Sequence, residues 1–90
     1  MKKQIDDVKK FHKSFGITNN EYPTLNKESF MLRFNLMKEE NDEYLNACKE
    51  GDLVEIADAL GDMMYILCGT ILSHGLQYKI EEIFQEIQSS

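Results

Sequence analysis

The chain has 90 residues and a formal net charge of −6 at pH 7, with 16 acidic and 10 basic side chains. A single domain of this size buries only about 60 to 65 per cent of its unfolded surface, so the core of a lone monomer is expected to be marginal. The acidic balance disfavours a nucleic-acid backbone or an anionic membrane as a partner, because both are negatively charged.

The ends and the cysteines bear on the cellular compartment. The stretch Met1–Asp7 lacks the apolar segment of a signal peptide. Cys48 and Cys68 show no CxxC spacing and lie in apolar stretches, which predicts buried, reduced thiols. A cytoplasmic location is therefore expected.

The first element in chain order is a helix predicted over residues 2–15, and Gly16 follows it at a position typical of a helix end. Its apolar side chains recur at helical spacing: Ile5, Val8, Phe11 and Phe15. His12 is expected to be partly exposed on this helix. A loop is predicted from Ile17 to about Asn26, and Asn26 is predicted to cap the next helix.

Three further helices complete the chain. The second is expected to end near Gly51, and the third to run from Asp52 to Gly75. The fourth has one apolar face, formed by Ile80, Ile83, Phe84 and Ile87, and its acidic residues are turned outward. No alternating strand pattern is present. The sequence predicts one all-α domain over residues 1–90, resembling an antiparallel four-helix bundle.

Two acidic clusters stand on either side of the break at Gly51-Asp52. The members before the break are Glu39, Glu40 and Glu43, and those after it are Glu55, Asp58 and Asp62. Helices joined by so short a link must lie antiparallel side by side. At a rise of ~1.5 Å per residue, Glu40, Glu43, Asp58 and Asp62 reach similar levels. Such an all-oxygen environment suits Mg²⁺ or Mn²⁺.

The apolar residues predict which helix faces are covered. The second helix is expected to bury Phe30, Phe34, Met37, Tyr44, Leu45 and Cys48, whereas Glu40 and Glu43 continue a separate stripe with Leu32, Leu36 and Ala47. The third helix is expected to bury Leu53, Ile56, Ala57, Leu60, Met63, Met64, Leu67 and Ile71. Glu55, Asp58 and Asp62 lie opposite that face, which places them at the mouth of a cleft.

Simpler interpretations compete with a metal site. Charged helix positions are usually solvated. Asp52 and Glu55 also have the spacing of a capping box, with Asp52 as N-cap, so Glu55 ranks below Asp58 and Asp62 as a ligand.

The third helix also predicts self-association. Its run from Met63 to Leu72 is apolar on nearly all sides, which neighbours on one side cannot cover. The run is too short for a bilayer span of about 20 residues. A homodimer or higher homo-oligomer is expected to complete the fold.

Together these residues resemble the all-α nucleoside triphosphate pyrophosphohydrolases, the MazG-like group that includes phosphoribosyl-ATP pyrophosphohydrolase and dimeric dUTPases. The resemblance lies in three segments: Phe11-His12-x-x-Phe15-Gly16, Leu32-Arg33-x-x-Leu36-x-x-Glu39-Glu40-x-x-Glu43, and Ile56 to Tyr65 followed by Gly69-Thr70. It implies cleavage of the α–β phosphoanhydride of a nucleotide, giving a monophosphate and pyrophosphate with Mg²⁺ or Mn²⁺. A bound cation is also physically required, because a negatively charged triphosphate is repelled by an acidic cleft unless metal ions bridge the two sets of charge.

The resemblance also implies roles for single residues. Glu40, Glu43 and Asp62 match metal ligands, and Glu39 matches the residue that orients or deprotonates the attacking water. The family pattern Glu-x-x-Asp places Ala59 where a glutamate is usual, and Asp58, on the same face as Asp62, is proposed to supply that carboxylate.

Two further residues are candidates for contacting the substrate. Arg33 is expected to meet a phosphate or to pair with one of the acids. Tyr65 is expected to border the base pocket or to belong to the core.

Three functions remain open at the level of sequence. The first is a metal-dependent pyrophosphohydrolase acting on a (d)NTP. The second is phosphoribosyl-ATP hydrolysis, for which no basic cluster is evident. The third is a non-catalytic helical oligomerisation or binding module.

Overall fold

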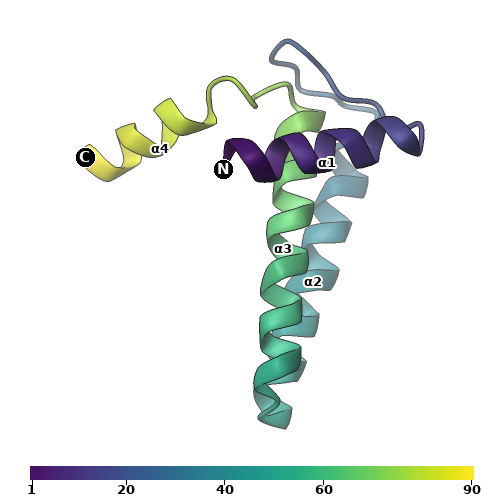
Figure 1. The fold of residues 1–90 in the computed structure, drawn as a ribbon, viewed down its shortest axis with the longest axis vertical. Coiled ribbons are helices and arrows are strands. Elements are labelled where there is room, and N and C mark those ends of the chain that lie inside the picture. Colours follow the sequence, from purple (N-terminus) through teal and green to yellow (C-terminus); the bar gives the residue numbers. More distant parts are fainter.

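The computed structural model describes residues 1–90 and contains four helices and no strand. The helices are α1 (Lys2–Ser14), α2 (Phe30–Glu50), α3 (Leu53–Ser73) and α4 (Ile80–Ser89). Helices α2 and α3 form an antiparallel hairpin, α1 crosses its open end, and α4 leads away from it (Figure 1). The all-α prediction and the order of the four helices are confirmed.

The short link between α2 and α3 makes the hairpin. Gly51 ends α2 in the left-handed region at φ 68°, a conformation that glycine adopts without steric cost. The side chain of Asp52 then accepts a hydrogen bond of 3.1 Å from the backbone N–H of Glu55. Asp52 is therefore the predicted N-cap of α3, and its bond satisfies one of the free N–H groups at the helix start.

The prediction that Asn26 caps the second helix is wrong. Helix α2 begins at Phe30, and Asn26 lies before it with φ 44°. Its side-chain amide instead donates to the backbone carbonyl of Ser73 at 3.1 Å and to Ser73 Oγ at 2.6 Å. Because the last carbonyls of α3 need partners, this long-range contact displaces the local cap.

The hydrophobic core lies where α1 crosses the top of α3. It contains Ile5, Val8, Cys68, Ile71 and Leu72, with Leu76 and Ile80 packed against it. His12 is buried on α1, whereas Phe11 and Phe15 are exposed. The buried face of α1 thus advances from Ile5 and Val8 to His12, which corrects the sequence expectation for His12 and the two phenylalanines.

A different face of α2 from the predicted one packs on α3. Its buried and half-buried residues are Arg33, Leu36, Glu40, Tyr44 and Ala47, at the 3-4 spacing of a helix–helix seam. The corresponding residues of α3 include the buried Ala59 and Gly69, and the half-buried Ile56, Met63 and Ile66. Ala47, Ala59 and Gly69 allow the two helices to approach closely. A prediction that places the bulkiest apolar residues in the core does not reveal this.

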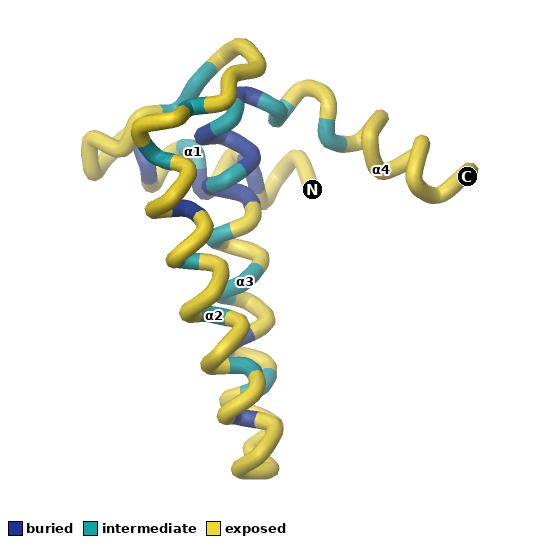
Figure 2. Tube along the Cα trace, turned by 180° about the vertical axis from the view of Figure 1, so that it is seen from behind, coloured by how far each residue is buried: buried dark blue, intermediate teal, exposed yellow.

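Most of the apolar side chains that were predicted to be core are exposed in the single chain. On α2 these are Phe30, Phe34, Met37, Leu45 and Cys48; on α3 they are Leu53, Ala57, Leu60, Met64 and Leu67. Figure 2 shows the same exposure along the lower hairpin and along α4. Cys68 is buried as predicted, and Cys48 is not.

The fourth helix does not close a bundle within one chain. Helix α2 packs on α3, and α1 packs on α3, but α4 makes no comparable contact with any helix. The radius of gyration is 14.3 Å, whereas a compact chain of this length has about 12 Å. The apolar face of α4 is uncovered, with Phe84 61% and Ile87 68% exposed.

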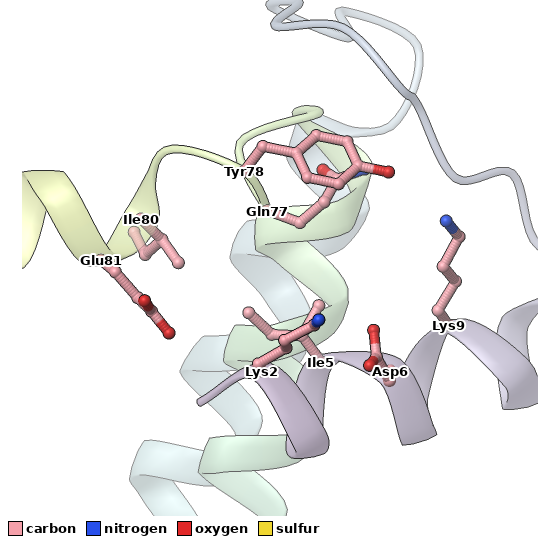
Figure 3. A pocket seen from close by; sticks show the side chains of 8 residues that line it. All are labelled: Lys2, Ile5, Asp6, Lys9, Gln77, Tyr78, Ile80 and Glu81. Atoms are coloured by element: carbon pink, nitrogen blue, oxygen red, sulfur yellow. The ribbon is translucent and has the colours of Figure 1, made fainter.

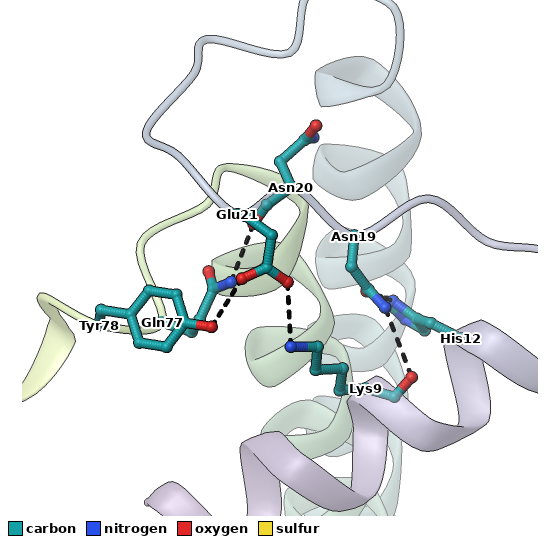
Figure 4. A network of polar contacts seen from close by, with 7 residues as sticks. All are labelled: Lys9, His12, Asn19, Asn20, Glu21, Gln77 and Tyr78. Carbon is teal, nitrogen blue, oxygen red and sulfur yellow. Dashed lines mark hydrogen bonds and ion pairs between the residues drawn. The ribbon is translucent and has the colours of Figure 1, made fainter.

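The loop between α1 and α2 is tied to both α1 and the α3–α4 link (Figure 4). Glu21 pairs with Lys9 at 3.0 Å and accepts a hydrogen bond of 2.6 Å from the Tyr78 hydroxyl. Gln77 donates to the carbonyl of Asn20 at 2.9 Å. The hydrogen bond from Tyr78, followed by that from Lys9, holds the pKa of the Glu21 carboxyl below its usual value.

Helix α3 is long and apolar enough, by length and composition alone, to cross a membrane, and it is the sole helix of the chain that is. A core helix of a soluble protein passes the same test. Asp62 lies near its middle, where charged groups are costly in a bilayer, and Asp58 lies one turn nearer its start.

Candidate metal centre

Three carboxylates meet halfway along the hairpin. Oxygen atoms of Glu40, Glu43 and Asp62 all lie within 4.8 Å of one another. Glu40 and Glu43 share a face of α2 at a spacing of three residues, and Asp62 faces them from α3. The expectation that the two acidic clusters face each other is confirmed for these three residues.

Glu40 is the innermost of the three. It is half-buried, and its Oε2 is fully covered yet accepts no hydrogen bond. Loss of contact with water raises the pKa of the Glu40 carboxyl, and the nearby charges of Glu43 and Asp62 raise it further. A covered carboxylate oxygen without a donor is a costly arrangement, and a cation coordinated there would relieve it.

The remaining predicted ligands lie beside this group. Asp58 and Glu55 line a groove of about 290 Å³ between the lower ends of α2 and α3, and Glu43 lines it too. Neither Asp58 nor Glu55 belongs to the group of three carboxylates. Ala59, which occupies the position of the usual family glutamate, is buried against the neighbouring helix and lines the same groove.

Glu39 is exposed one residue before Glu40. One residue corresponds to a rotation of about 100° around the helix, so its carboxylate flanks the group without belonging to it. Its negative charge adds to the causes that raise the pKa of Glu40. This is a suitable position for contacting a water molecule at the edge of the group.

Arg33 and Tyr65, the predicted substrate contacts, lie above the carboxylates. Arg33 is only 6% exposed and forms no ion pair; its guanidinium donates to Thr70 Oγ1 at 3.1 Å and to the Ile66 carbonyl at 3.0 Å. Burial lowers its pKa, although arginine stays charged. Tyr65 is exposed and stacks edge-on with Phe11, with ring centroids 5.6 Å apart.

A second groove lies away from the carboxylates, between the start of α1 and the α3–α4 link (Figure 3). Its volume is about 220 Å³, and both lysines and acids line it, among them Lys2, Lys9, Asp6 and Glu81. Gln77 reaches its wall, and the Gln77 Oε1 atom accepts no hydrogen bond within the chain. Its mixed charges contrast with the purely acidic character of the hairpin group.

Sequence reasoning missed the contribution of His12. Its Nδ1 lies 2.8 Å from Asn19 Oδ1, and its ring closes the junction of α1 with Gly69 of α3. The spacing Ile5, Val8, His12 was the signal available in the sequence.

Comparison with known proteins agrees with this acidic hairpin. The family model described as phosphoribosyl-ATP pyrophosphohydrolase matches residues 8–90. The chain is also 34% identical, over 67 residues, to "Uncharacterized protein L479" of Acanthamoeba polyphaga mimivirus. That alignment covers 69% of this chain but 27% of the viral protein, so the chain spans about a quarter of the length of its relative. No solved structure matches. The chain belongs to the phosphoribosyl-ATP pyrophosphohydrolase family, part of the MazG-like nucleotide pyrophosphohydrolase superfamily.

Proposed function

We propose that this protein is a metal-dependent nucleoside triphosphate pyrophosphohydrolase formed by the single domain 1–90. In the proposed reaction, water attacks the α-phosphorus, the bond to the α–β bridging oxygen breaks, and a monophosphate and pyrophosphate leave. The observation that carries this proposal is the group of Glu40, Glu43 and Asp62, with its covered and unpartnered Glu40 oxygen, in a chain of this family.

The donor set fits a hard divalent cation. Carboxylate oxygens are the ligands that Mg²⁺ and Mn²⁺ prefer, and all three residues offer them within a single small space. Glu40, Glu43 and Asp62 would hold the ion, which supplies charge neutralisation for the phosphates. Asp58, beside Glu43 in the adjoining groove, is proposed as a further ligand, and Glu55 as a more distant alternative.

Glu39 is the proposed general base. It lies next to Glu40 and is exposed, so it can accept a proton from a water molecule at the edge of the group. Tyr65 is proposed to border the nucleoside, because it reaches the surface one helical turn beyond Asp62. Contact with a phosphate needs a side chain that solvent can reach. Arg33 is buried, so we do not propose this role for it.

Phosphoribosyl-ATP is the second candidate substrate, because the matching family model carries that description. The two candidates share the bond that is cleaved and differ in the additional ribose phosphate. A pyrophosphate-release assay with phosphoribosyl-ATP and a panel of canonical and noncanonical (d)NTPs, each with Mg²⁺, Mn²⁺ or EDTA, distinguishes them. Turnover of (d)NTPs that EDTA abolishes supports the first proposal. No turnover of any substrate with either metal would leave a binding module.

A homodimer or higher homo-oligomer is part of this proposal. Only 12 of the 90 residues are buried in one chain, which is a small core even for a domain of this size. Apolar side chains remain uncovered along α2, α3 and α4, and contiguous apolar surface of this kind marks an interface. A second copy offers the matching surface, and a cytoplasmic location is proposed with it.

A further inference from the structure

Arg33 is a buried cation whose surroundings contain no carboxylate partner. Its hydrogen bonds go instead to two groups of α3, the Thr70 hydroxyl and the Ile66 carbonyl, and Thr70 Oγ1 donates to the same carbonyl at 2.8 Å. Burying an arginine without a counter-ion costs free energy. The planar fork of the guanidinium fixes both the distance and the direction of its hydrogen bonds.

Gly69 provides the socket for this guanidinium. A Cβ atom at Gly69 would collide with Nη2 of Arg33 and would lie 3.0 Å from Nε2 of His12. Gly61, two turns earlier on α3, has nothing within 4 Å of such a Cβ atom. The absence of a side chain at Gly69 therefore permits the contact between Arg33 and α3, whereas Gly61 has no such role.

The contact between Arg33 and Gly69, called here the clamp, lies on the same helix–helix seam as the carboxylates. Arg33 is two helical turns before Glu40 on α2, and Gly69, beside which its guanidinium lies, is two turns after Asp62 on α3. In an antiparallel pair, fixing Arg33 beside Gly69 therefore places Glu40 beside Asp62. A slip of one turn would move these carboxylates by ~5.4 Å along the axis, more than the 4.8 Å that now encloses the group.

We propose that Arg33, seated in the Gly69 socket, is a positioning residue that sets the register of α2 on α3 and thereby holds Glu40 opposite Asp62. The metal-binding consequence rests on the proposed function, whereas the effect on the hairpin does not. Arg33 contacts neither the phosphates nor the ion in this role.

The test compares Gly69→Ala with the matched control Gly61→Ala, and adds Arg33→Lys, which keeps the charge but loses the planar fork. The Kd for Mn²⁺ is measured by calorimetry without nucleotide and without urea. Circular dichroism first shows that each variant is folded. We expect Gly69→Ala and Arg33→Lys to raise the Kd about tenfold or more, and Gly61→Ala to leave it unchanged. Native-state hydrogen exchange of residues 40–47 and 56–62 is measured on the same samples, and both perturbing variants should exchange faster there than the control.

Four results would overturn the proposal. If both perturbing variants bind Mn²⁺ as the wild type does but have a raised KM for nucleotide, Arg33 is a substrate contact. If they bind Mn²⁺ as the wild type does and only their free energy of unfolding falls, Arg33 is a structural residue. If the wild type takes up no Mn²⁺, the proposed function fails, and hydrogen exchange then decides alone: equal rates in Gly69→Ala and Gly61→Ala would refute the clamp. If one perturbing variant does not fold, the other gives the comparison; loss of folding in both, with Gly61→Ala intact, would likewise assign a structural role only.

Discussion

Replacing Glu40 with glutamine should make the metal-free protein slightly more stable. The substitution keeps the shape of the side chain and removes a charge that lies within 4.8 Å of two other carboxylates. At 4.8 Å, two like charges in water-like surroundings repel by about 0.9 kcal/mol. With two neighbours, relief of about 1 to 2 kcal/mol is the upper range, because the group is partly exposed and salt screens it.

Metal should reverse this order of stability. When the free Mn²⁺ concentration is 100 times the Kd, the free energy of unfolding of the wild-type protein rises by about 2.7 kcal/mol. Glu40→Gln loses the ligand whose covered oxygen has no other partner, so it should gain much less. The variant is thus expected to be the more stable protein in EDTA and the less stable one in saturating Mn²⁺.

The sign of the pH dependence follows from the raised pKa of Glu40. The folded state binds this proton more tightly than the unfolded state, so the stabilisation is complete below the unfolded pKa and is lost as pH rises through the folded value. In EDTA, wild-type stability should therefore contain a component that falls as pH increases above the ordinary glutamate range. Glu40→Gln should lack that component.

The assay is urea unfolding followed by circular dichroism, at one fixed protein concentration because self-association would otherwise shift the curves. Asp42→Asn is the matched control: Asp42 is an exposed carboxylate of the same helix, paired with Lys38 at 3.4 Å and outside the metal group. The control should keep the full response to Mn²⁺ and full turnover. Equal stabilisation of Glu40→Gln and wild type by Mn²⁺, or near-normal turnover of Glu40→Gln, would refute the metal assignment.

Other substitutions test the remaining assignments. Glu39→Gln should lower turnover roughly 100-fold or more while calorimetry finds metal and nucleotide still bound; loss of binding would make Glu39 a ligand. Asp58→Ala should be nearly as damaging to turnover as Asp62→Ala, whereas Glu55→Ala should be mild; activity that survives in Asp62→Ala but not in Glu55→Ala would move the ligands one turn towards the break. Phe84→Glu should weaken self-association in analytical ultracentrifugation, since this side chain is uncovered in one chain; a wild-type protein that sediments as a monomer at micromolar concentration would contradict self-association itself.

Local sequence signals determined the helices and much of the candidate site. Gly51 and Asp52 specify a helix end followed at once by a helix start, because glycine adopts the left-handed conformation and aspartate caps free N–H groups. Two helices so closely joined have a register that counting recovers. Glu40, Glu43 and Asp62 were therefore predictable as neighbours from spacing alone.

Tertiary structure decided which helix faces are covered and what each polar residue contacts. Counting bulky side chains assigned Phe11 and Cys48 to the interior, yet both are exposed in one chain, because α1 buries Ile5, Val8 and His12 and α2 buries Arg33 and Ala47. Asn26 has the composition of a helix cap, but it bonds to the end of α3, 47 residues away in sequence. Such contacts depend on which distant groups need a hydrogen-bond partner in the folded chain, and local periodicity carries no record of that need.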